Sequence, residues 1–494
     1  MNALLIYPKI PDTYWSFRHA LRMVGKRAAQ PPLGLMTIGA LLPREWNKRL
    51  IDTNVERLKD SDLKWADVAL IGGMHLQQDD LIAIVERCHA RGLRCVVGGP
   101  ITSSLPQSTL QADHVVIGEA EDLIAELAQD LERGAARPVY QAAERPAMEH
   151  SPLPDLSLIK MKRYSTMTVQ YSRGCPFNCE FCDIIEIYGR RPRTKAVEQV
   201  LAELDQLYAA GWRESVFVVD DNFIGNKPRA KVLLAAMREW MNAHGRPFNF
   251  TTEASLNLAE DPELMQLMKD AGFTAVFLGI ETPDECSLVA NHKEQNTRRD
   301  MLESIALIQR YGMEVMGGFI LGFDTDKEDV FDRLVEFIQK SAIPIAMVGL
   351  LEAMPGTQLF RRLGSEGRIL SKGNGNNTDC HLNFLPRMNA ARLVEGYRNV
   401  LSRIYGCDAY YERVKLFLSR CQPRQQTRMT YANVRAFCAS VMRQGLFGKA
   451  RLSYWKFVLT AATKYRRSFG TAMTLAVMGY HFQTLTEELT KADA

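Results

Sequence analysis

The chain has 494 residues, of which 46% are hydrophobic and 24% are charged, so it exceeds one ordinary domain and can bury two or three cores. Its formal net charge of +4 is unevenly distributed, because residues 381–494 carry 18 Lys and Arg against 6 Asp and Glu. Residues 1–380 are correspondingly acidic, with 43 Lys and Arg against 51 Asp and Glu. The basic end therefore either meets an anionic partner, such as a membrane surface or an acidic substrate, or packs as a helical face on the acidic remainder.

The N-terminus begins with a short apolar run, residues 3–7, that lacks the basic region of a secretory signal. We interpret this run as a buried strand and expect a cytoplasmic protein, in which thiols stay reduced. Peripheral contact with the inner face of the membrane through the basic C-terminal region is left open. No nucleic-acid partner is expected.

Residues 1–133 alternate short apolar runs with helical patterns, which predicts a doubly wound α/β domain with a parallel sheet. We expect strands at 4–7, 50–52, 68–72, 95–98 and 114–117, and helices around 35–42, 79–90 and 120–131. Ligands of such sheets bind at the carboxyl ends of the strands. The candidate loops there are Gly72-Gly73-Met74-His75, Gly98-Gly99-Pro100-Ile101 and Gly118-Glu119.

Residues 134–160 contain four prolines and show weak periodicity, which indicates a linker. Across residues 161–380 a strand-and-helix pattern repeats six times, fewer than the eight units of a closed barrel. The expected strands are 167–171, 215–219, 248–252, 275–280, 315–320 and 345–350. Residues 381–494 lack a strand signal and are predicted to form a basic helical domain. Its apolar stretch 469–482 is too short to cross a bilayer and either packs as a buried helix or lies in a membrane interface.

Cys175, Cys179 and Cys182 follow the first of these six strands in a C-x3-C-x2-C spacing. Three thiolates within eight residues can hold one iron–sulfur cluster, whereas a closed [4Fe–4S] site needs four protein ligands. One iron would then stay open to bind a substrate. A structural zinc site would need a fourth Cys or His nearby, and none lies between residues 170 and 193. A disulfide framework is not expected in a long chain without a secretory signal.

The segment 173–183 strongly resembles the cluster loop of the radical S-adenosylmethionine (radical SAM) enzymes. The resemblance implies a partial (β/α)6 barrel in which Cys175, Cys179 and Cys182 hold a [4Fe–4S] cluster and S-adenosyl-L-methionine (SAM) binds the open iron. Motifs that end the later strands match the family in order. Residue by residue, the resemblance implies that SAM is contacted by Phe181, Asp220, Asn222, Glu253, Ser255 and Glu281.

With such a barrel, residues 1–133 resemble the cobalamin-binding, flavodoxin-like domain of one large radical SAM subgroup, through segments 31–35 and 118–121. The resemblance implies corrinoid contacts from the loop residues Gly72, Gly73, His75, Gly98, Gly99, Gly118 and Glu119. The motif Asp-x-His-x-x-Gly, which supplies an axial His to cobalt elsewhere, is absent, so cobalamin is expected to bind without a protein His on the metal. A module of the same fold that binds no corrinoid is the alternative.

Within this subgroup, the chain resembles the hopanoid C-2 methylases at segments 171–176, 220–226, 281–283 and 455–457. The resemblance implies a cobalamin-dependent (class B) radical SAM methyltransferase that methylates an unactivated carbon of a small molecule or lipid. It also implies an electron donor such as a flavodoxin or ferredoxin. Two alternatives stay open: a radical SAM enzyme that performs aminocarboxypropyl transfer, cyclisation or dehydrogenation without cobalamin chemistry, and a non-catalytic corrinoid- or SAM-binding sensor. The intact cysteine triad argues against the sensor, which needs no open iron.

Overall fold

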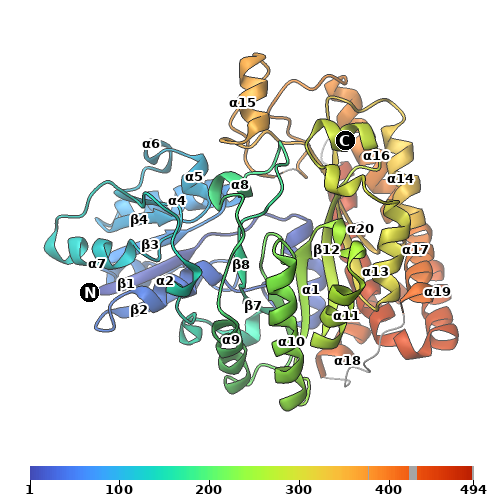
Figure 1. The fold of residues 1–494 in the computed structure, drawn as a ribbon, viewed down its shortest axis with the longest axis horizontal. Coiled ribbons are helices and arrows are strands. Elements are labelled where there is room, and N and C mark those ends of the chain that lie inside the picture. Colours follow the sequence, from blue (N-terminus) through green and yellow to red (C-terminus); the bar gives the residue numbers. More distant parts are fainter. Residues whose placement is uncertain (377, 422–430, 492–494) are drawn as a thin grey trace.

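Two six-stranded parallel sheets organise the chain in the computed structural model, which describes residues 1–376, 378–421 and 431–491 (Figure 1). The first sheet has the order β2-β1-β3-β4-β5-β6. Its strands are β1 (Asn2–Tyr7), β2 (Asn47–Asp52), β3 (Val68–Gly72), β4 (Arg94–Gly98), β5 (His114–Ile117) and β6 (Val139–Gln141). The first five strands are the predicted ones, and their order is that of a flavodoxin-like sheet, whose ligand crevice lies between the ends of β1 and β3.

Helices cover both faces of this first sheet. They are α2 (Leu33–Leu41), α3 (Asp60–Trp65), α4 (Gln78–His89), α5 (Ile101–Ser104), α6 (Gln107–Leu110) and α7 (Ile124–Arg133). β6 lies inside segment 134–160, for which the sequence predicted only a linker, and it pairs in parallel with β5. Three residues with alternating exposure give too weak a pattern for a strand prediction. The domain boundaries themselves stay a prediction.

The second sheet runs in chain order from one edge to the other, β7-β10-β11-β12-β13-β14, with every pair parallel. Its strands are β7 (Thr166–Val169), β10 (Ser215–Val218), β11 (Asn249–Ala254), β12 (Phe273–Glu281), β13 (Glu314–Leu321) and β14 (Ile345–Leu350). All six were predicted, and the edge strands β7 and β14 do not pair with each other. The sheet is therefore a partial barrel.

The helices of the partial barrel follow its strands. They are α8 (Ile184–Ile187), α9 (Val197–Ala209), α10 (Lys227–Ala243), α11 (Pro262–Ala271), α12 (Glu285–Ala290), α13 (Met301–Arg310), α14 (Val330–Ser341) and α15 (Gln358–Ser365). Capping residues fix several starts. Asn226 and Asp261, for example, accept a hydrogen bond from the third residue of α10 and α11.

The N-terminal segment 14–29, which includes α1 (Arg18–Val24), leaves the first domain and lies along the open side of the barrel. Ala28 forms a parallel bridge with Tyr164 just before the edge strand β7. The Trp15 ring lies 5.0 Å from the ring of Phe277 in β12. The Tyr14 ring lies 5.5 Å from that of Phe482 in the last helix. The segment thus bridges β7 and the C-terminal helices.

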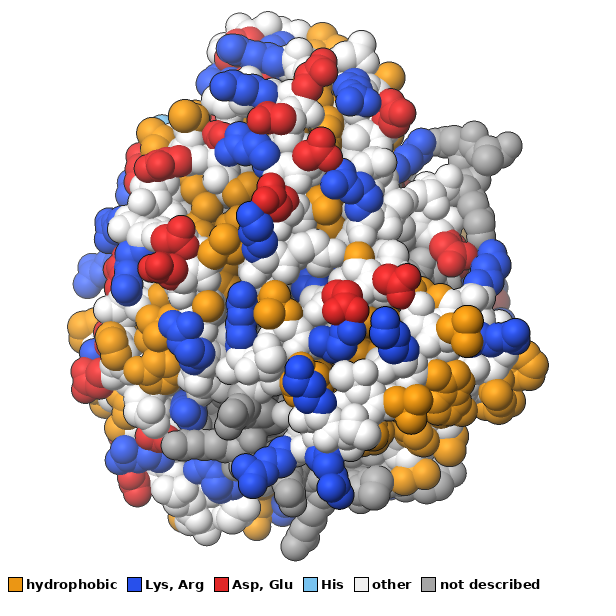
Figure 2. Space-filling model, turned by 90° about the vertical axis from the view of Figure 1, so that its right-hand side faces the viewer, with side chains coloured by type: hydrophobic (Ala, Val, Ile, Leu, Met, Phe, Trp, Pro, Cys, Tyr) orange, Lys and Arg blue, Asp and Glu red, His pale blue; other side chains and the backbone are white. Residues whose placement is uncertain are grey.

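The predicted helical character of the C-terminal region is confirmed in its described residues. They form α16 (Ala390–Tyr405), α17 (Cys407–Arg420), α18 (Tyr431–Ser440), the π-helix η8 (Val441–Leu446), α19 (Arg451–Lys464) and α20 (Phe469–Lys491). The apolar stretch 469–482 belongs to α20, where Leu475, Ala476 and Phe482 are buried, so it packs inside the protein. In the described residues, no helix has the length and apolar character that crossing a membrane requires. Figure 2 shows the face that carries α17 and α19, where hydrophobic side chains gather beside Lys and Arg.

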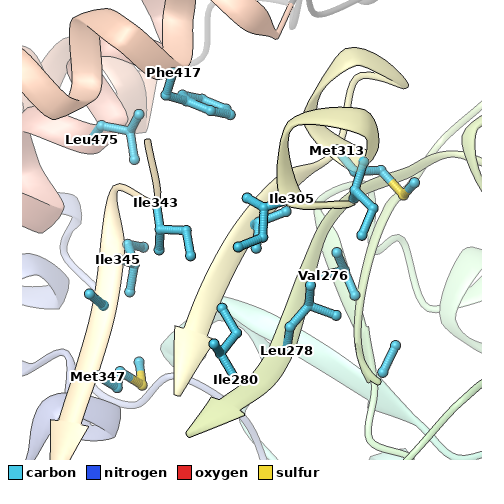
Figure 3. Packing of buried hydrophobic residues seen from close by; sticks show 14 of the residues in the cluster. Val276, Leu278, Ile280, Ile305, Met313, Ile343, Ile345, Met347, Phe417 and Leu475 are labelled. Carbon is cyan, nitrogen blue, oxygen red and sulfur yellow. The ribbon is translucent and has the colours of Figure 1, made fainter. Parts of the chain in front are cut away.

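One hydrophobic core joins the barrel to the C-terminal helices (Figure 3). Val276 and Leu278 of β12 pack with Ile305 of α13 on the outer side of the sheet. At the edge strand β14, the Tyr405 hydroxyl of α16 donates a 2.6 Å hydrogen bond to the Ala346 carbonyl. The helical domain therefore covers the β14 edge, which would otherwise expose unpaired backbone groups.

Candidate active site

The cysteine loop is held at its base by a short antiparallel pair, β8 (Ser172–Arg173) and β9 (Arg193–Thr194). Gly174 has a φ of +90°, and a Cβ there would lie 2.7 Å from the Gly189 carbonyl oxygen. The Cys175 amide donates a 3.2 Å hydrogen bond to that same carbonyl. Glycine before the first cysteine thus lets the loop close on itself.

The role of the three cysteines as cluster ligands stays a prediction. In the described part of the chain their sulfurs do not all lie within 4.8 Å of one another. Asn222 Nδ2 lies 3.7 Å from Cys175 Sγ, and Gln295 Nε2 lies 3.7 Å from Cys179 Sγ. Such donors stabilise thiolate ligands of a cluster.

Lys293 brings a positive charge to this triad. Its ammonium forms an ion pair with Glu281 and lies 5.9 Å from the centre of the Phe181 ring. Burial alone would lower the pKa of Lys293, but the Glu281 carboxylate and the Cys179 thiolate outweigh burial and raise it. Burial raises the pKa of Cys175 and of Cys182, so a nearby cation helps to keep them ionised as ligands. The structure thus pairs Glu281, a predicted SAM contact, with Lys293.

A cluster of carboxyl groups lies at the ends of β10 and β11. Asp220 accepts hydrogen bonds from the amides of Tyr171 (2.8 Å) and Ser172 (2.9 Å), so it fixes the entry to the cysteine loop. Asp221 and Glu253 instead line the central cavity. Burial raises the pKa of Asp220 to about 6. Burial together with the neighbouring carboxylates raises the pKa of Asp221 to about 7 and of Glu253 to about 8.

This acidic cluster fits a cationic ligand. In the described ranges, neither Asp221 nor Glu253 has an ion-pair partner, and the neighbouring carboxylates disfavour ionisation of both. A sulfonium or ammonium group, both of which SAM carries, would relieve that cost. The other predicted contacts lie close by: Asn222 donates a 3.3 Å hydrogen bond to Ser255, and Phe181 lines the cavity. Their roles toward SAM stay predictions.

The loops after β3 and β4 of the first domain reach the cavity through Met74, His75 and Pro100, whereas their predicted glycines do not line it. Gly99 has a φ of +91°, and a Cβ there would lie 2.8 Å from the Gly73 carbonyl oxygen, so the loops after β3 and β4 touch through their backbones. His75 is buried and lines the cavity. Its Nε2 lies 3.2 Å from the Gly373 carbonyl oxygen, while its Nδ1 has no partner in the described chain. These loops fit a cofactor that approaches their backbone from the barrel side.

Glu119 has a different environment from the one predicted. Its side chain is 3% exposed and pairs with Arg173 at 2.6 Å and with Arg193 at 2.5 Å. Glu121 pairs with Arg173 as well, at 2.7 Å. The loop after β5 therefore holds the β8–β9 base of the cysteine loop and does not line the cavity, because its glutamates are occupied by the two arginines.

One cavity of about 2580 Å³ connects these parts. Its walls come from four places: the first-domain loops, the cysteine loop, the interior of the barrel, and the helices around segment 14–29. Representative lining residues from these places are Met74, Phe181, Phe217 and Met473. A single small molecule occupies about 300–1,000 Å³, so the cavity has room for several.

Comparisons with known proteins identify the family. Residues 169–338 match the radical SAM superfamily, and residues 357–494 match a domain of unknown function, DUF4070. The chain is 41% identical over 490 residues to an uncharacterized methyltransferase of Synechocystis sp., covering 98% of this chain and 91% of that protein. It is 34% identical over 505 residues to the hopanoid C-2 methylase of Rhodopseudomonas palustris, covering 99% and 94%. The chain belongs to the radical SAM superfamily.

Solved structures give the same fold. The cobalamin-dependent SAM radical enzyme OxsB superposes with a TM-score of 0.64 at 15% identity, covering 99% of this chain and 80% of that one. The radical SAM methyltransferase TsrM of Kitasatospora setae gives a TM-score of 0.61 at 13% identity, covering 94% and 99%. Membership confirms the predicted radical SAM enzyme, whose cofactors are a [4Fe–4S] cluster and SAM, and the full-length relatives place it among the methyltransferases of the superfamily.

The sequence did not predict three residues of this radical SAM site. Asp221 stands beside the predicted Asp220, and only the side-chain direction decides which of them reaches the cavity. Lys293 and Gln295 lie in the loop after α12, more than 100 residues from the cysteines that they approach. Nothing in that loop's residue pattern marks it as part of the site.

Proposed function

We propose that this radical SAM enzyme is a cobalamin-dependent methyltransferase that methylates an unactivated carbon of a polycyclic lipid, such as a hopanoid, taken from a membrane surface. The observation that carries the proposal is the continuous cavity from the first-domain loops, past Phe181 and Asp183 of the cysteine loop, into the barrel. Its middle is lined by apolar side chains such as Phe217 and Met316, which suit a hydrocarbon skeleton. The similarity to the hopanoid C-2 methylase over the whole chain supports the choice of lipid.

Each cofactor has residues that fit it. When bound, the cluster with SAM supplies the radical that removes hydrogen from carbon, and cobalamin carries the methyl group. Cys175, Cys179 and Cys182 hold the cluster, and Asn222 and Gln295 donate hydrogen bonds to two of the sulfurs. The carboxyl groups near the cysteines orient the cationic SAM, and the first-domain loops after β3 and β4 receive the corrinoid.

A basic and apolar surface on η8 and α19 suits an anionic membrane. We name it the docking surface; its exposed apolar residues are Met442, Leu446, Phe447, Leu452 and Leu459, between 47% and 82% exposed. Residues 431–468 contain eight Lys and Arg and no Asp or Glu. Exposed apolar side chains among cations are typical of surfaces that insert shallowly into anionic bilayers. Figure 2 shows the two kinds of side chain together on this face.

The docking surface adjoins the cavity through one continuous helical segment. α18 contributes Val434 and Phe437 to the cavity wall and continues without a break into η8. A lipid that leaves the bilayer beside η8 would therefore reach the cavity wall along α18. This arrangement links the membrane contact to substrate entry.

The function is tested by anaerobic purification from cells supplied with cobalamin, followed by iron, sulfide and corrinoid analysis per chain. About four irons and one corrinoid, together with transfer of label from methyl-labelled SAM to a hopanoid, are the expected results. Four irons without corrinoid would overturn the proposal of cobalamin-dependent methyl transfer and favour another radical SAM reaction. The Cys179→Ala variant is the control that must lose 5′-deoxyadenosine formation.

Membrane binding is tested separately by vesicle co-sedimentation. Wild-type protein should bind vesicles containing phosphatidylglycerol, bind neutral vesicles less, and dissociate as salt is added. Phe447→Ser with Leu452→Ser should reduce binding, because these are the two most exposed apolar residues of the docking surface. Leu370→Ser, at a residue 59% exposed outside that surface, is the matched control. Equal binding by both variants would remove the docking surface from the proposal.

A further inference from the structure

The cavity has a second polar end, at the amino ends of the barrel strands and away from the cysteines. The first residues of β7, β10, β11 and β13 are Thr166, Ser215, Asn249 and Glu314, and all four line the cavity. Strands rise about 3.3 Å per residue, so Asn249 lies roughly 13 Å below Glu253, which is four residues further along β11. The cavity is therefore polar at both ends of the barrel.

The wall between these ends is largely apolar. Phe217, Met316, Ile320 and Ile345 line it, with Thr251 as a polar exception. β13 alternates strictly between half-buried and buried residues, which places Glu314, Met316 and Ile320 on the same, inner face of the strand. A ligand that fills this space must be apolar along its length and can be polar at its far end.

Glu314 is one of the charged groups at that far end, where Arg246, Lys269 and Asp270 also line the cavity. The Glu314 carboxyl has no hydrogen-bond or ion-pair partner in the described residues, and the surrounding wall includes Phe417 and Leu418 of α17. Burial raises the pKa of Glu314 to about 7. Lys269 lines the same end, but its ammonium lies 5.8 Å from the Tyr311 ring and makes no ion pair with Glu314.

A purely structural role does not explain this carboxyl. Glu314 is half-buried and faces the cavity without a partner in the described chain, so it loses part of its hydration and gains no interaction from the fold in return. Ser215 and Asn249 likewise have side chains without a hydrogen-bond partner in the described chain. Three uncommitted polar groups at one end of an apolar cavity fit a ligand that brings its own donors.

We propose that Glu314 anchors the hydrogen-bond-donating end, a hydroxyl or an amine, of an elongated hydrocarbon substrate whose opposite end is methylated beside the cysteines. The inference rests on the proposed function, because it takes the cavity as the substrate site. It adds that the substrate is an amphiphile bound in one direction and that Glu314 determines specificity without touching the reacting carbon.

The test measures binding and methylation separately on the anaerobic holoenzyme. Three probes share one pentacyclic triterpene skeleton: the parent hydrocarbon, a derivative with a terminal hydroxyl, and one with a terminal amine, each presented in detergent micelles. Wild-type protein should bind the two polar probes at least about tenfold more tightly than the hydrocarbon, as expected for a hydrogen bond to a charged group. Glu314→Leu should abolish this preference, and Glu314→Gln should retain it for the hydroxyl but lose it for the amine.

Lys269→Met is the matched control, because it removes another charge from the same end and should leave the preference unchanged. Both Glu314 variants should unfold at a temperature no lower than the wild type, whereas a structural role would lower it. Equal binding of all three probes, or a preference that survives Glu314→Leu, would overturn the inference while methylation of any probe upholds the proposed function. If no probe binds or is methylated, the proposed function fails and the inference fails with it.

Discussion

The ion pairs of Glu119 give the sharpest test of how the first domain supports the cysteine loop. In the variant Glu119→Gln, Arg193 loses its carboxylate partner, while Arg173 keeps Glu121. The arginine side chains are only 12% and 18% exposed, so water cannot replace the lost charge. Breaking a buried pair on one side costs about 3–5 kcal/mol, and the remaining Glu121 places this case near the lower value.

A loss of about 3 kcal/mol in the free energy of unfolding lowers the melting temperature by about 6–12 °C for domains of about 150–250 residues. Because Arg173 and Arg193 form the base of the cysteine loop, iron retained per chain should fall as well. Differential scanning calorimetry and iron analysis of anaerobically purified protein measure both effects.

Glu126→Gln is the matched control for this experiment. Glu126 pairs with Arg137 at 2.5 Å in the same domain, but both side chains are 53% exposed. Exposed pairs contribute about 0–1 kcal/mol, so this variant should keep its melting temperature and its iron. If the two variants behave alike, the ion pairs of Glu119 do not support the cysteine loop and the reasoning is refuted.

Three further predictions concern the cofactor sites. Cys179→Ala should stay folded yet release no 5′-deoxyadenosine from SAM, and activity in this variant would contradict the cluster assignment. The pKa of Glu253 is raised to about 8, so the folded protein holds a proton that the unfolded chain has lost, and stability falls as pH rises from about 5 to 8. In denaturant titrations, Glu253→Gln should therefore stabilise the SAM-free protein by about 2–4 kcal/mol at pH 8 and by much less at pH 5. An equal gain at both pH values would argue against this explanation. Gly99→Val should lower the corrinoid retained per chain without lowering iron, because the valine side chain would collide with the loop after β3. Unchanged corrinoid would show that this loop does not take part in cobalamin binding.

The sequence predicted those parts of the fold that depend on local patterns. The barrel strands span four to nine residues, and each was located to within a few residues of its place. The cysteine spacing is equally local, since the chemistry of a cluster requires ligands close together in the chain. Both kinds of signal can be read without knowing what packs against what.

The remainder depends on contacts between distant segments. The Gly118-Glu119 segment was predicted to contact a corrinoid, but its glutamate pairs with an arginine 54 residues away, in another sheet. Lys293 reaches the triad from a loop that follows the fourth barrel strand. β6 was missed because three residues are too short for a periodic pattern. In each case a charge or a short strand acquires its role only from the partner that the fold provides.

A physical requirement on lipid substrates supports the proposed position of the docking surface. Moving a hydrocarbon from a bilayer into water costs about 0.8 kcal/mol per methylene, so a skeleton with about twenty such groups would have to overcome about 16 kcal/mol. The concentration of free lipid dissolved in water is therefore too low for the enzyme to bind it from solution. Direct transfer avoids this barrier only if the apolar entrance begins where the protein meets the membrane. The continuous segment from η8 to α18, which is exposed and apolar at one end and lines the cavity at the other, satisfies that condition.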